Sequence, residues 1–433
     1  MSNQPANTSR RNFLRAGAAT TAMLASGVHA RGESESQEDK AKVRIAIVGC
    51  GGRGSGASAD SLTINKNATL AAMADVDGSK CKKLAANLQE RFGEQLDVPA
   101  ERMYSGLDGY QKILEDPDIQ IVMFATPPGF RPRHILEAVS AGKNVFAEKP
   151  SCVDPAGYKI CLAADAAAKA KGTSIVTGTQ YRRQANYIGA VEQIRDGAIG
   201  DIVSGTTRYC SNGIWYKARK EGETDAEYQL RNWMHFVWLS GDQIAEQAVH
   251  NIDAMNWVFG GPPESAYGSG GRFTRPKDSE MWDNVNIDYV YPGDRILSFM
   301  CRQIPGSQGD NGSYIRGTKG TCYIGAFNRG SWIKDRDGNE VWKMGGKISD
   351  AYKQEHKDLV NAVVTGNSIV ELKQTADSSL TAVLGRMAAY TGKKVTWDFV
   401  TKESGLDLFP KDFNLDMKLE SPGFAVPGKT KLV

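Results

Sequence analysis

The sequence has no apolar run long enough to cross a membrane. The most apolar stretch near the N-terminus, Ala16–Val28, has 13 residues, whereas a transmembrane helix needs about 20. No later segment reads as a membrane span. We therefore expect no membrane-spanning segment.

The chain also lacks a strong excess of either charge. It has 53 Lys and Arg against 50 Asp and Glu, a formal net charge of +3. Residues 1–30 contain three arginines and no acid, so without them the formal charge is 0 (3 − 3). Because nucleic-acid binding depends on clustered positive charge, this balance argues against nucleic acid as a partner.

Paired cysteines are missing as well. The seven cysteines are odd in number and show no paired spacing, and Cys50 lies in a glycine-rich loop where a disulfide would obstruct a ligand. We expect mostly free thiols, as in a protein that folds in a reducing compartment. The 46 glycines fit an α/β protein with many tight turns.

The N-terminus carries a twin-arginine motif, Ser9-Arg10-Arg11-Asn12-Phe13-Leu14-Arg15. Val28-His29-Ala30 then has the small-x-small form of a signal-peptidase site, which predicts a signal peptide over 1–30 and a linker over 31–41. A disordered tail with chance arginines is the alternative. The motif predicts a periplasmic or exported protein, recognised by the twin-arginine export machinery after folding around its cofactor.

A dinucleotide-binding pattern follows the linker. The β-branched run 43–48 leads into Gly49-Cys50-Gly51-Gly52-Arg53-Gly54. Gly49, Gly51 and Gly54 permit a tight turn, close approach of pyrophosphate and packing of a helix on the strand.

A second predicted strand, 69–74, ends at Asp75, 21 residues after Gly54. An acid at this point holds the adenosine ribose hydroxyls and disfavours a 2′-phosphate, so NAD is favoured over NADP. An ordinary turn or capping aspartate is the alternative.

The strand pattern repeats at 119–124 and 144–147, with a helix expected over 134–142. Thr126 and Pro127 follow one strand, and Glu148 and Lys149 follow the other, so all four lie where ligands bind in an open α/β sheet. These elements predict a Rossmann domain over 42–178, with Lys149 placed for chemistry. A surface lysine is the alternative.

Residues 179–433 are expected to form a second α/β domain. Candidate strands at 202–209, 285–291, 296–302 and 320–324 suit one large open mixed or antiparallel sheet. Helices would cover one face and leave the other for a partner subunit, so we expect a homo-oligomer. Amphipathic helices are expected over 355–364 and 378–390, and the tail from Pro410 is expected to wrap this surface or a neighbouring subunit's.

The segment 241–253 reads as one helix. It carries Glu246, His250 and Asp253 at i, i+4 and i+7, so the three side chains would share one face. A buried structural histidine and a metal site are the alternatives.

Aromatic and basic residues between the motifs are candidate sugar contacts. The region 209–238 is rich in Trp and Tyr, which stack on the CH faces of sugars, although core packing explains tryptophans equally well. Trp233, within this region, and Arg182, which precedes it, are the candidate substrate contacts.

Glu148-Lys149-Pro150 downstream of this fingerprint resembles the signature of the Gfo/Idh/MocA family. The resemblance implies a Rossmann domain followed by an α/β domain with a large open sheet. It also implies that Lys149 meets the substrate hydroxyl beside the nicotinamide, that His250 is the catalytic histidine and that no metal is needed. Glu246 stands where the family has an aspartate, which puts the identity of the substrate in doubt.

The expected site is therefore divided among three roles. The catalytic residues are Lys149, His250 and Glu246. The cofactor-binding residues are Gly49, Gly51, Gly52, Arg53, Gly54, Asp75, Thr126, Pro127, Glu148 and Lys149. The substrate-binding residues are Lys149, Arg182, Trp233, Asp253 and His250.

Three hypotheses of function remain open. The first is an NAD(P)-dependent oxidoreductase that acts on a sugar, polyol or sugar derivative with a tightly held cofactor, because little free NAD exists outside the cytoplasm. The second is a redox-neutral NAD-dependent glycoside hydrolase or lyase that works by transient oxidation and elimination. The third is a non-catalytic sugar-binding protein.

Overall fold

A computed structural model describes residues 41–433. The predicted signal peptide, 1–30, and nearly all of the predicted linker lie outside the described residues. Within the described part of the chain, no helix is long and apolar enough to cross a membrane.

The first sheet is parallel and has six strands in the order β3-β2-β1-β4-β5-β6. Its strands are β1 (Val43–Val48), β2 (Ala68–Asp75), β3 (Met103–Ser105), β4 (Ile121–Phe124), β5 (Asn144–Ala147) and β6 (Ile175–Thr177). The strand order reverses between β1 and β4, and ligands bind beyond the carboxyl ends of strands at such a point.

Helices connect these strands and cover both faces of the sheet, which is why the strands consist mainly of apolar residues. They are α1 (Gly52–Ile64), α2 (Gly78–Phe92), α3 (Gly109–Glu115), α4 (Arg131–Ser140) and α5 (Pro155–Lys171). Strand β4 is buried along its whole length, as expected for a parallel strand covered on both faces. The predicted Rossmann fold is confirmed.

The second sheet has nine strands in the order β14-β13-β12-β11-β7-β10-β9-β8-β15. They are β7 (Ile202–Ser211), β8 (Ser265–Gly271), β9 (Asn284–Tyr291), β10 (Arg295–Gln303), β11 (Asp310–Gly317), β12 (Gly320–Gly325), β13 (Ser331–Asp335), β14 (Glu340–Met344) and β15 (Val395–Thr396). Only β7 and β10 pair in parallel, so the sheet is mixed, and the predicted α/β class is confirmed.

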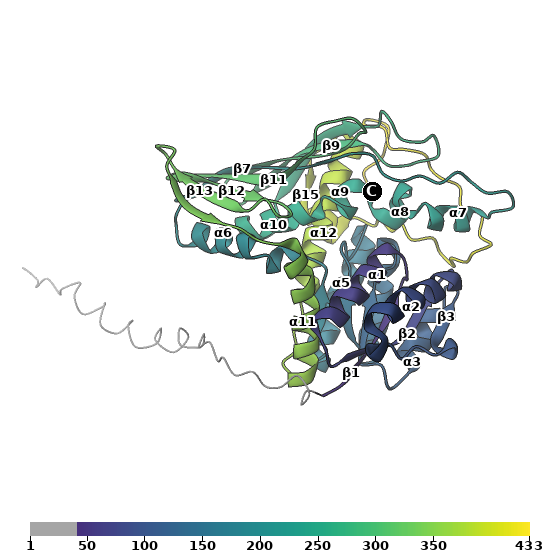
Figure 1. The fold of residues 1–433 in the computed structure, drawn as a ribbon. Coiled ribbons are helices and arrows are strands. Elements are labelled where there is room, and N and C mark those ends of the chain that lie inside the picture. The colour runs from purple at the N-terminus through teal and green to yellow at the C-terminus, as the bar shows by residue number, and fades with distance from the viewer. Residues whose placement is uncertain (1–40) are drawn as a thin grey trace, which may run out of the picture. The chain divides into compact units, whose positions relative to one another are not determined.

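Helices gather on one face of this sheet (Figure 1). They include α6 (Ala185–Arg195), α10 (Val249–Phe259) and α12 (Leu372–Thr391), each of which contacts strands of the sheet. On the other face, alternating side chains of β8 and β10 are exposed, among them Tyr267, Ile296 and Met300. This face is therefore open in the described chain.

Helix α11 (Ile348–Thr365) leaves the second sheet and returns to the Rossmann fold, where it packs against α1 and β5 (Figure 1). The segment after it also joins the edge of the first sheet, since the N–H of Ile175 donates to the carbonyl of Ile369 at 2.7 Å. Part of the predicted second domain, 179–433, therefore packs on the Rossmann domain.

The expected single helix over 241–253 is wrong. Helix α9 (Asp242–Glu246) ends before Gln247, and α10 begins at Val249. The physical reason is that the Glu246 carbonyl accepts a hydrogen bond from the Lys149 ammonium at 2.6 Å, although a continuous helix would use this carbonyl for the N–H four residues later. The three polar side chains consequently do not share one face.

Asp253 instead forms a buried ion pair with Arg182. The guanidinium donates to both carboxylate oxygens, at 2.8 and 2.9 Å, and the Asp253 side chain is only 2% exposed. The Ser378 hydroxyl of α12 donates to the same carboxylate at 2.8 Å. This pair ties the chain after β6 to α10 and α12. Neither Arg182 nor Asp253 contacts Lys149, whose hydrogen bonds go to Glu246.

We predict that Arg182→Met lowers the free energy of unfolding by about 3–5 kcal/mol, because it leaves the Asp253 carboxylate buried without its cation. Urea unfolding measures the loss, and the double variant Arg182→Met/Asp253→Asn should recover part of it. Lys402→Met is the control, since the Lys402–Asp398 pair is 68% and 67% exposed and should contribute less than about 1 kcal/mol. Equal losses in the two single variants would contradict the assignment.

Candidate active site

The loop between β1 and α1 has the backbone geometry of a phosphate cradle. Gly49 adopts φ +94°, and a Cβ there would approach the Ala125 backbone to 2.8 Å. A Cβ on Gly54 would lie 1.9 Å from the Gly49 carbonyl oxygen, so only glycine allows α1 to pack this closely. The roles predicted for these two glycines in the turn and the packing agree with this geometry.

The space above the loop is open. A Cβ on Gly51 or Gly52 would meet no other atom within 4 Å, and no side chain caps the N-terminus of α1. The free N–H groups and the dipole of a helix N-terminus favour an anion. The residues present therefore fit the pyrophosphate of a dinucleotide.

Asp75 faces this loop from the end of β2. Its Oδ2 accepts the Cys50 N–H at 2.8 Å, and its Oδ1 accepts the Asp77 N–H at 3.0 Å. Lys80 also pairs with Oδ1, at 3.1 Å, from the exposed surface of α2. The carboxylate is thus fixed beside the loop, as a ribose ligand requires.

A cleft of about 160 Å³ lies beyond these strand ends, and five of the predicted cofactor residues line it: Gly49, Gly51, Asp75, Thr126 and Pro127. Leu230 of α7 (Asp225–Arg231) and Trp233 line it too. Trp233, a predicted substrate contact, thus lies on the wall of the cleft that Asp75 and the glycine loop also line. Its contact with a substrate stays a prediction.

His134 and Arg131, both on α4, are components of the site that sequence reasoning missed. His134 lines the cleft, its Nδ1 lies 3.2 Å from the Thr126 hydroxyl, and burial lowers its pKa to about 3. Arg131 donates to the carbonyls of Thr126 and Pro150 at 2.6 and 2.7 Å. It therefore ties the loop after β4 to the loop after β5. The helix predicted here begins only at His134, so the sequence gave no signal for this role.

Lys149 follows β5 and reaches across to the second domain. Its ammonium donates to Glu246 Oε1 at 2.9 Å as well as to the Glu246 carbonyl, and the two side chains are 14% and 12% exposed. The structure thus brings together two of the three predicted catalytic residues. The carboxylate faces the ammonium and fixes its position.

His250, in the first turn of α10, is a neutral base. Burial, followed by the positive charges of Lys149 and Arg53, holds its pKa well below the usual value for histidine. The side chain is half-buried, and neither ring nitrogen hydrogen-bonds another described residue. An imidazole of this kind can accept a proton from a hydroxyl group at neutral pH.

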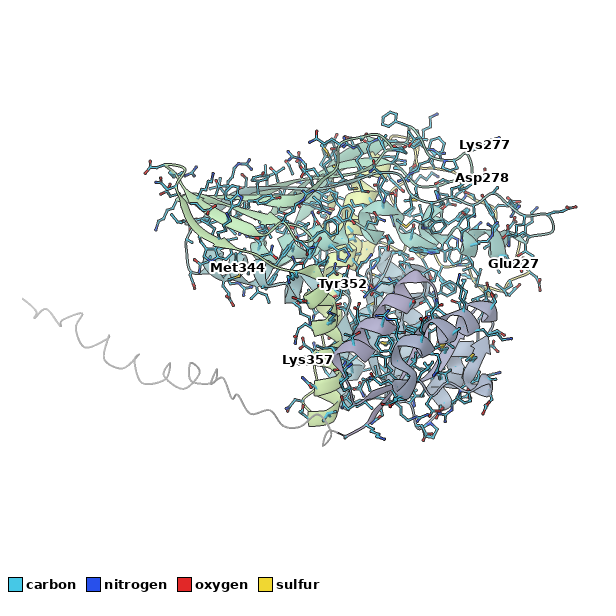
Figure 2. All side chains as sticks on the ribbon, in the orientation of Figure 1. Glu227, Lys277, Asp278, Met344, Tyr352 and Lys357 are labelled. Carbon is cyan, nitrogen blue, oxygen red and sulfur yellow. The ribbon has the colours of Figure 1, made fainter. Side chains whose placement is uncertain are left out.

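Arg53 and Glu148 pair with one another in the structure. The guanidinium forms an ion pair with the buried carboxylate and lies over the Tyr352 ring, with its central carbon 4.6 Å from the ring centre. Although burial opposes ionisation of Glu148, the charges of Arg53, Lys149 and Arg131 lower its pKa. Figure 2 labels Tyr352 near the start of α11, a residue the sequence gave no reason to select.

The described residues contain no group of three or more His, Cys, Asp or Glu side chains that could hold a metal ion. All seven cysteines are buried and free, as expected, with the sulfurs of Cys50 and Cys81 3.6 Å apart. The polar groups that converge here are thus an ammonium, a carboxylate and an imidazole beside a dinucleotide cleft.

Both domains of this chain match models of known protein families. Residues 43–177 match the oxidoreductase family with an NAD-binding Rossmann fold, and residues 187–323 match the GFO/IDH/MocA C-terminal domain. The chain belongs to the Gfo/Idh/MocA family of oxidoreductases. NAD is the cofactor of its Rossmann domain.

Individual relatives are distant. Inositol 2-dehydrogenase from Acidothermus cellulolyticus is 28% identical over 198 residues, 46% of this chain and 48% of the relative. Scyllo-inositol 2-dehydrogenase (NAD(+)) from Bacillus subtilis is 26% identical over 51% of this chain and 59% of the relative. The chain thus spans about half the length of these relatives.

Solved structures share the fold over most of their length. Levoglucosan dehydrogenase in complex with NADH and levoglucosan superposes with a TM-score of 0.65 at 18% identity, covering 82% of this chain and 99% of the other. Aldose-aldose oxidoreductase from Caulobacter crescentus gives a TM-score of 0.63 at 21% identity, with the same coverage.

We predict that Asp75→Ala weakens NAD binding roughly 10- to 100-fold, because a hydrogen bond to a charged group contributes about 1.5–3 kcal/mol. Fluorescence titration with NADH measures the change. Asp77→Ala is the matched control, since that carboxylate accepts from Ser79 in the next helix and should leave affinity within about twofold. An unchanged affinity in Asp75→Ala would remove Asp75 from the cofactor site.

Proposed function

We propose that this protein oxidises or reduces a hydroxyl-bearing carbon of a sugar, polyol or sugar derivative, with hydride transfer to or from a tightly held NAD. The observation that carries the proposal is a Lys149 ammonium that Glu246 holds in place after β5, with a His250 imidazole near enough for the Lys149 charge to lower its pKa. Alcohol oxidation needs both a base and a group that stabilises the developing alkoxide.

The residues divide these tasks according to their charge. NAD, when bound, supplies the hydride acceptor. The His250 imidazole accepts the hydroxyl proton, and the Lys149 ammonium donates a hydrogen bond to the same oxygen as it gains negative charge. Glu246 keeps the ammonium in position through its carboxylate and its carbonyl.

The substrate class is supported by the family and by the names of its members. The relatives include inositol dehydrogenases, and proteins of the same fold include levoglucosan dehydrogenase and aldose-aldose oxidoreductase. All of these names describe sugars or cyclitols. Glu246 and His250 offer polar groups suited to such a substrate.

Tight retention of the cofactor is supported by the walls of its cleft. Leu230 and Trp233 reach the cleft from the second domain, and Phe130, which also lines it, packs edge-on against Trp238 at 5.9 Å between ring centres. These side chains would add apolar contacts to a bound cofactor and so slow its release. Retention is required if a second sugar substrate, rather than free NAD, closes the redox cycle.

A redox-neutral cycle on a glycoside uses the same residues and is the second candidate. Transient oxidation would acidify the adjacent C–H, and elimination, water addition and return of the hydride would follow. It predicts turnover of a glycoside with no net change in NADH absorbance, whereas the oxidoreductase requires two sugars of which one is oxidised and one reduced. A non-catalytic sugar-binding protein would do neither.

We predict that Lys149→Met and His250→Gln each reduce kcat by about 10²–10⁴-fold with bound NAD retained. Lys357→Met, an exposed position on α11 labelled in Figure 2, is the control and should keep full activity. Single-turnover reduction of the bound cofactor measures the rate. Retained turnover in either active-site variant would remove that residue from the reaction.

The pH dependence separates the two candidate bases. Because the pKa of His250 is lowered, the imidazole stays neutral as the pH falls through the ordinary histidine range. The rate of hydroxyl oxidation should therefore be level between about pH 6.5 and 8 and should fall only at lower pH. A rate that rises steadily through the alkaline range would instead identify the lysine amine as the base.

We further propose that the protein is exported by the twin-arginine pathway, on the basis of Arg10, Arg11 and the sequence that follows them. Cell fractionation tests this. The variant Arg10→Lys/Arg11→Lys should remain with the cytoplasmic fraction, and an unaltered distribution would contradict export by this route.

The open face of the second sheet supports a homo-oligomer. Tyr267 and Ile296, 58% and 45% exposed, lie on neighbouring parts of this face, and apolar residues of this kind are typical of a subunit interface. Light scattering should report more than one chain per particle, and Tyr267→Asp should shift the population to monomer. A monomeric wild-type protein would contradict the proposal.

A further inference from the structure

A second cavity lies away from the cofactor cleft, between α12 and the C-terminal segment. Its volume is about 430 Å³, which is within the range of small-molecule sites. Helix α8 (Val237–Ser240) contributes part of one wall, and residues 406–410 and 419–433 contribute others. None of its lining residues lines the cofactor cleft.

The C-terminal segment is held against the chain around this cavity. The Leu408 N–H donates to Asp154 at 2.8 Å, the Ser421 hydroxyl donates to Glu280 at 2.7 Å, and the Trp282 indole donates to the Ala425 carbonyl at 3.1 Å. These contacts come from three different parts of the fold. The cavity is therefore a built feature, with part of its wall formed by a segment that is hydrogen-bonded to the rest of the fold.

Arg386 is the one feature of this cavity that core packing does not explain. Its side chain lines the cavity from α12 and is 2% exposed, and its central carbon lies 6.0 Å from the centre of the Tyr390 ring. No hydrogen bond or ion pair within residues 41–433 reaches its guanidinium. The Nη1 atom is buried without a partner. A buried charge is normally paired, so an unpaired guanidinium in the wall of a cavity indicates an anion that is missing from the protein itself.

The carboxylates nearby are committed to other donors. Asp154 accepts from Gly157 and Leu408, and Asp242 accepts from Trp282 and the Tyr390 hydroxyl. Both oxygens of Glu280 are also used, by the Val237 N–H at 2.7 Å and by Ser421. Two further anions line the cavity, and both have other partners: Glu420 pairs with Lys418 at 3.3 Å and is 83% exposed, and the terminal Val433 accepts from the Ser404 hydroxyl at 2.7 Å. Within residues 41–433, none of these carboxylates pairs with Arg386.

Most of the remaining lining residues are apolar, and the polar ones lie among them: Gln229, Glu280, Thr391, Glu420, Thr430 and Lys431. The apolar part of the wall consists of leucine and aromatic side chains, among them Trp238, Tyr390, Leu406, Leu408, Phe424 and Leu432. Such walls disfavour a sugar or a multiply charged phosphate, because few groups would replace their lost hydrogen bonds to water. One planar guanidinium matches one carboxylate, in a bidentate pair.

We propose that this cavity binds a monocarboxylate with an aliphatic or aromatic body, with the carboxylate on Arg386 and the body against the apolar walls. The ligand is neither the sugar nor the cofactor of the proposed reaction, and its site does not depend on that reaction. The inference therefore stands or falls separately from the proposed function.

The test is isothermal titration of the purified protein with octanoate and with 1-octanol, which shares the chain and lacks the charge. The wild type should bind one octanoate and should bind 1-octanol at least tenfold more weakly. Arg386→Met, which preserves the length of the side chain, should bind octanoate at least tenfold more weakly than the wild type. Arg91→Met, a change at an exposed position on α2, should leave the affinity unchanged.

Lys149→Met separates this cavity from the active site. It should bind octanoate as the wild type does, whereas a loss of binding in this variant would place the carboxylate at Lys149 and overturn the proposal. Failure of the wild type to bind octanoate at millimolar concentration, or equal binding by Arg386→Met, would also overturn it. If Arg386→Met does not fold, the preference of the wild type for octanoate over 1-octanol and the response of Arg386→Lys decide the question.

Discussion

The contact of the Lys149 ammonium with Glu246 is the interaction on which the rest of the site depends. Lys149 follows a strand of the Rossmann sheet and Glu246 ends a helix of the second domain, so this contact joins the two halves at the point of chemistry. It also takes the carbonyl that would have continued α9 into α10. The break in the helix and the position of the lysine thus have one cause.

That break changes what the following residues do. In a continuous helix, the side chains of Glu246, His250 and Asp253 would lie on one face, and all three could contact the same substrate. In the structure, Asp253 pairs with Arg182 in the interior, while His250 stays beside Lys149 without a hydrogen-bonding partner among the described residues. The carboxylate that holds the lysine and the base that meets the hydroxyl are therefore separate groups with separate tasks.

The Rossmann half could be predicted from sequence because each of its signals is local. Strand β1 was predicted at its observed limits, and Asp75 ends β2 as expected. Tyr352 and Trp233 could not be located in the same way, since their positions depend on how α11 and the segment before α8 fold back onto the first domain. No periodicity in the sequence encodes a contact between Arg53 and a tyrosine about 300 positions later.

The NAD-binding Rossmann domain is shown, and the proposal that goes furthest beyond it is that the protein retains its NAD rather than exchanging it freely. The most direct test is to denature the purified mature protein and quantify the NAD(H) and NADP(H) released. The account predicts close to one NAD(H) per chain and little NADP(H). A protein that is purified empty and binds added NAD weakly and reversibly would contradict it.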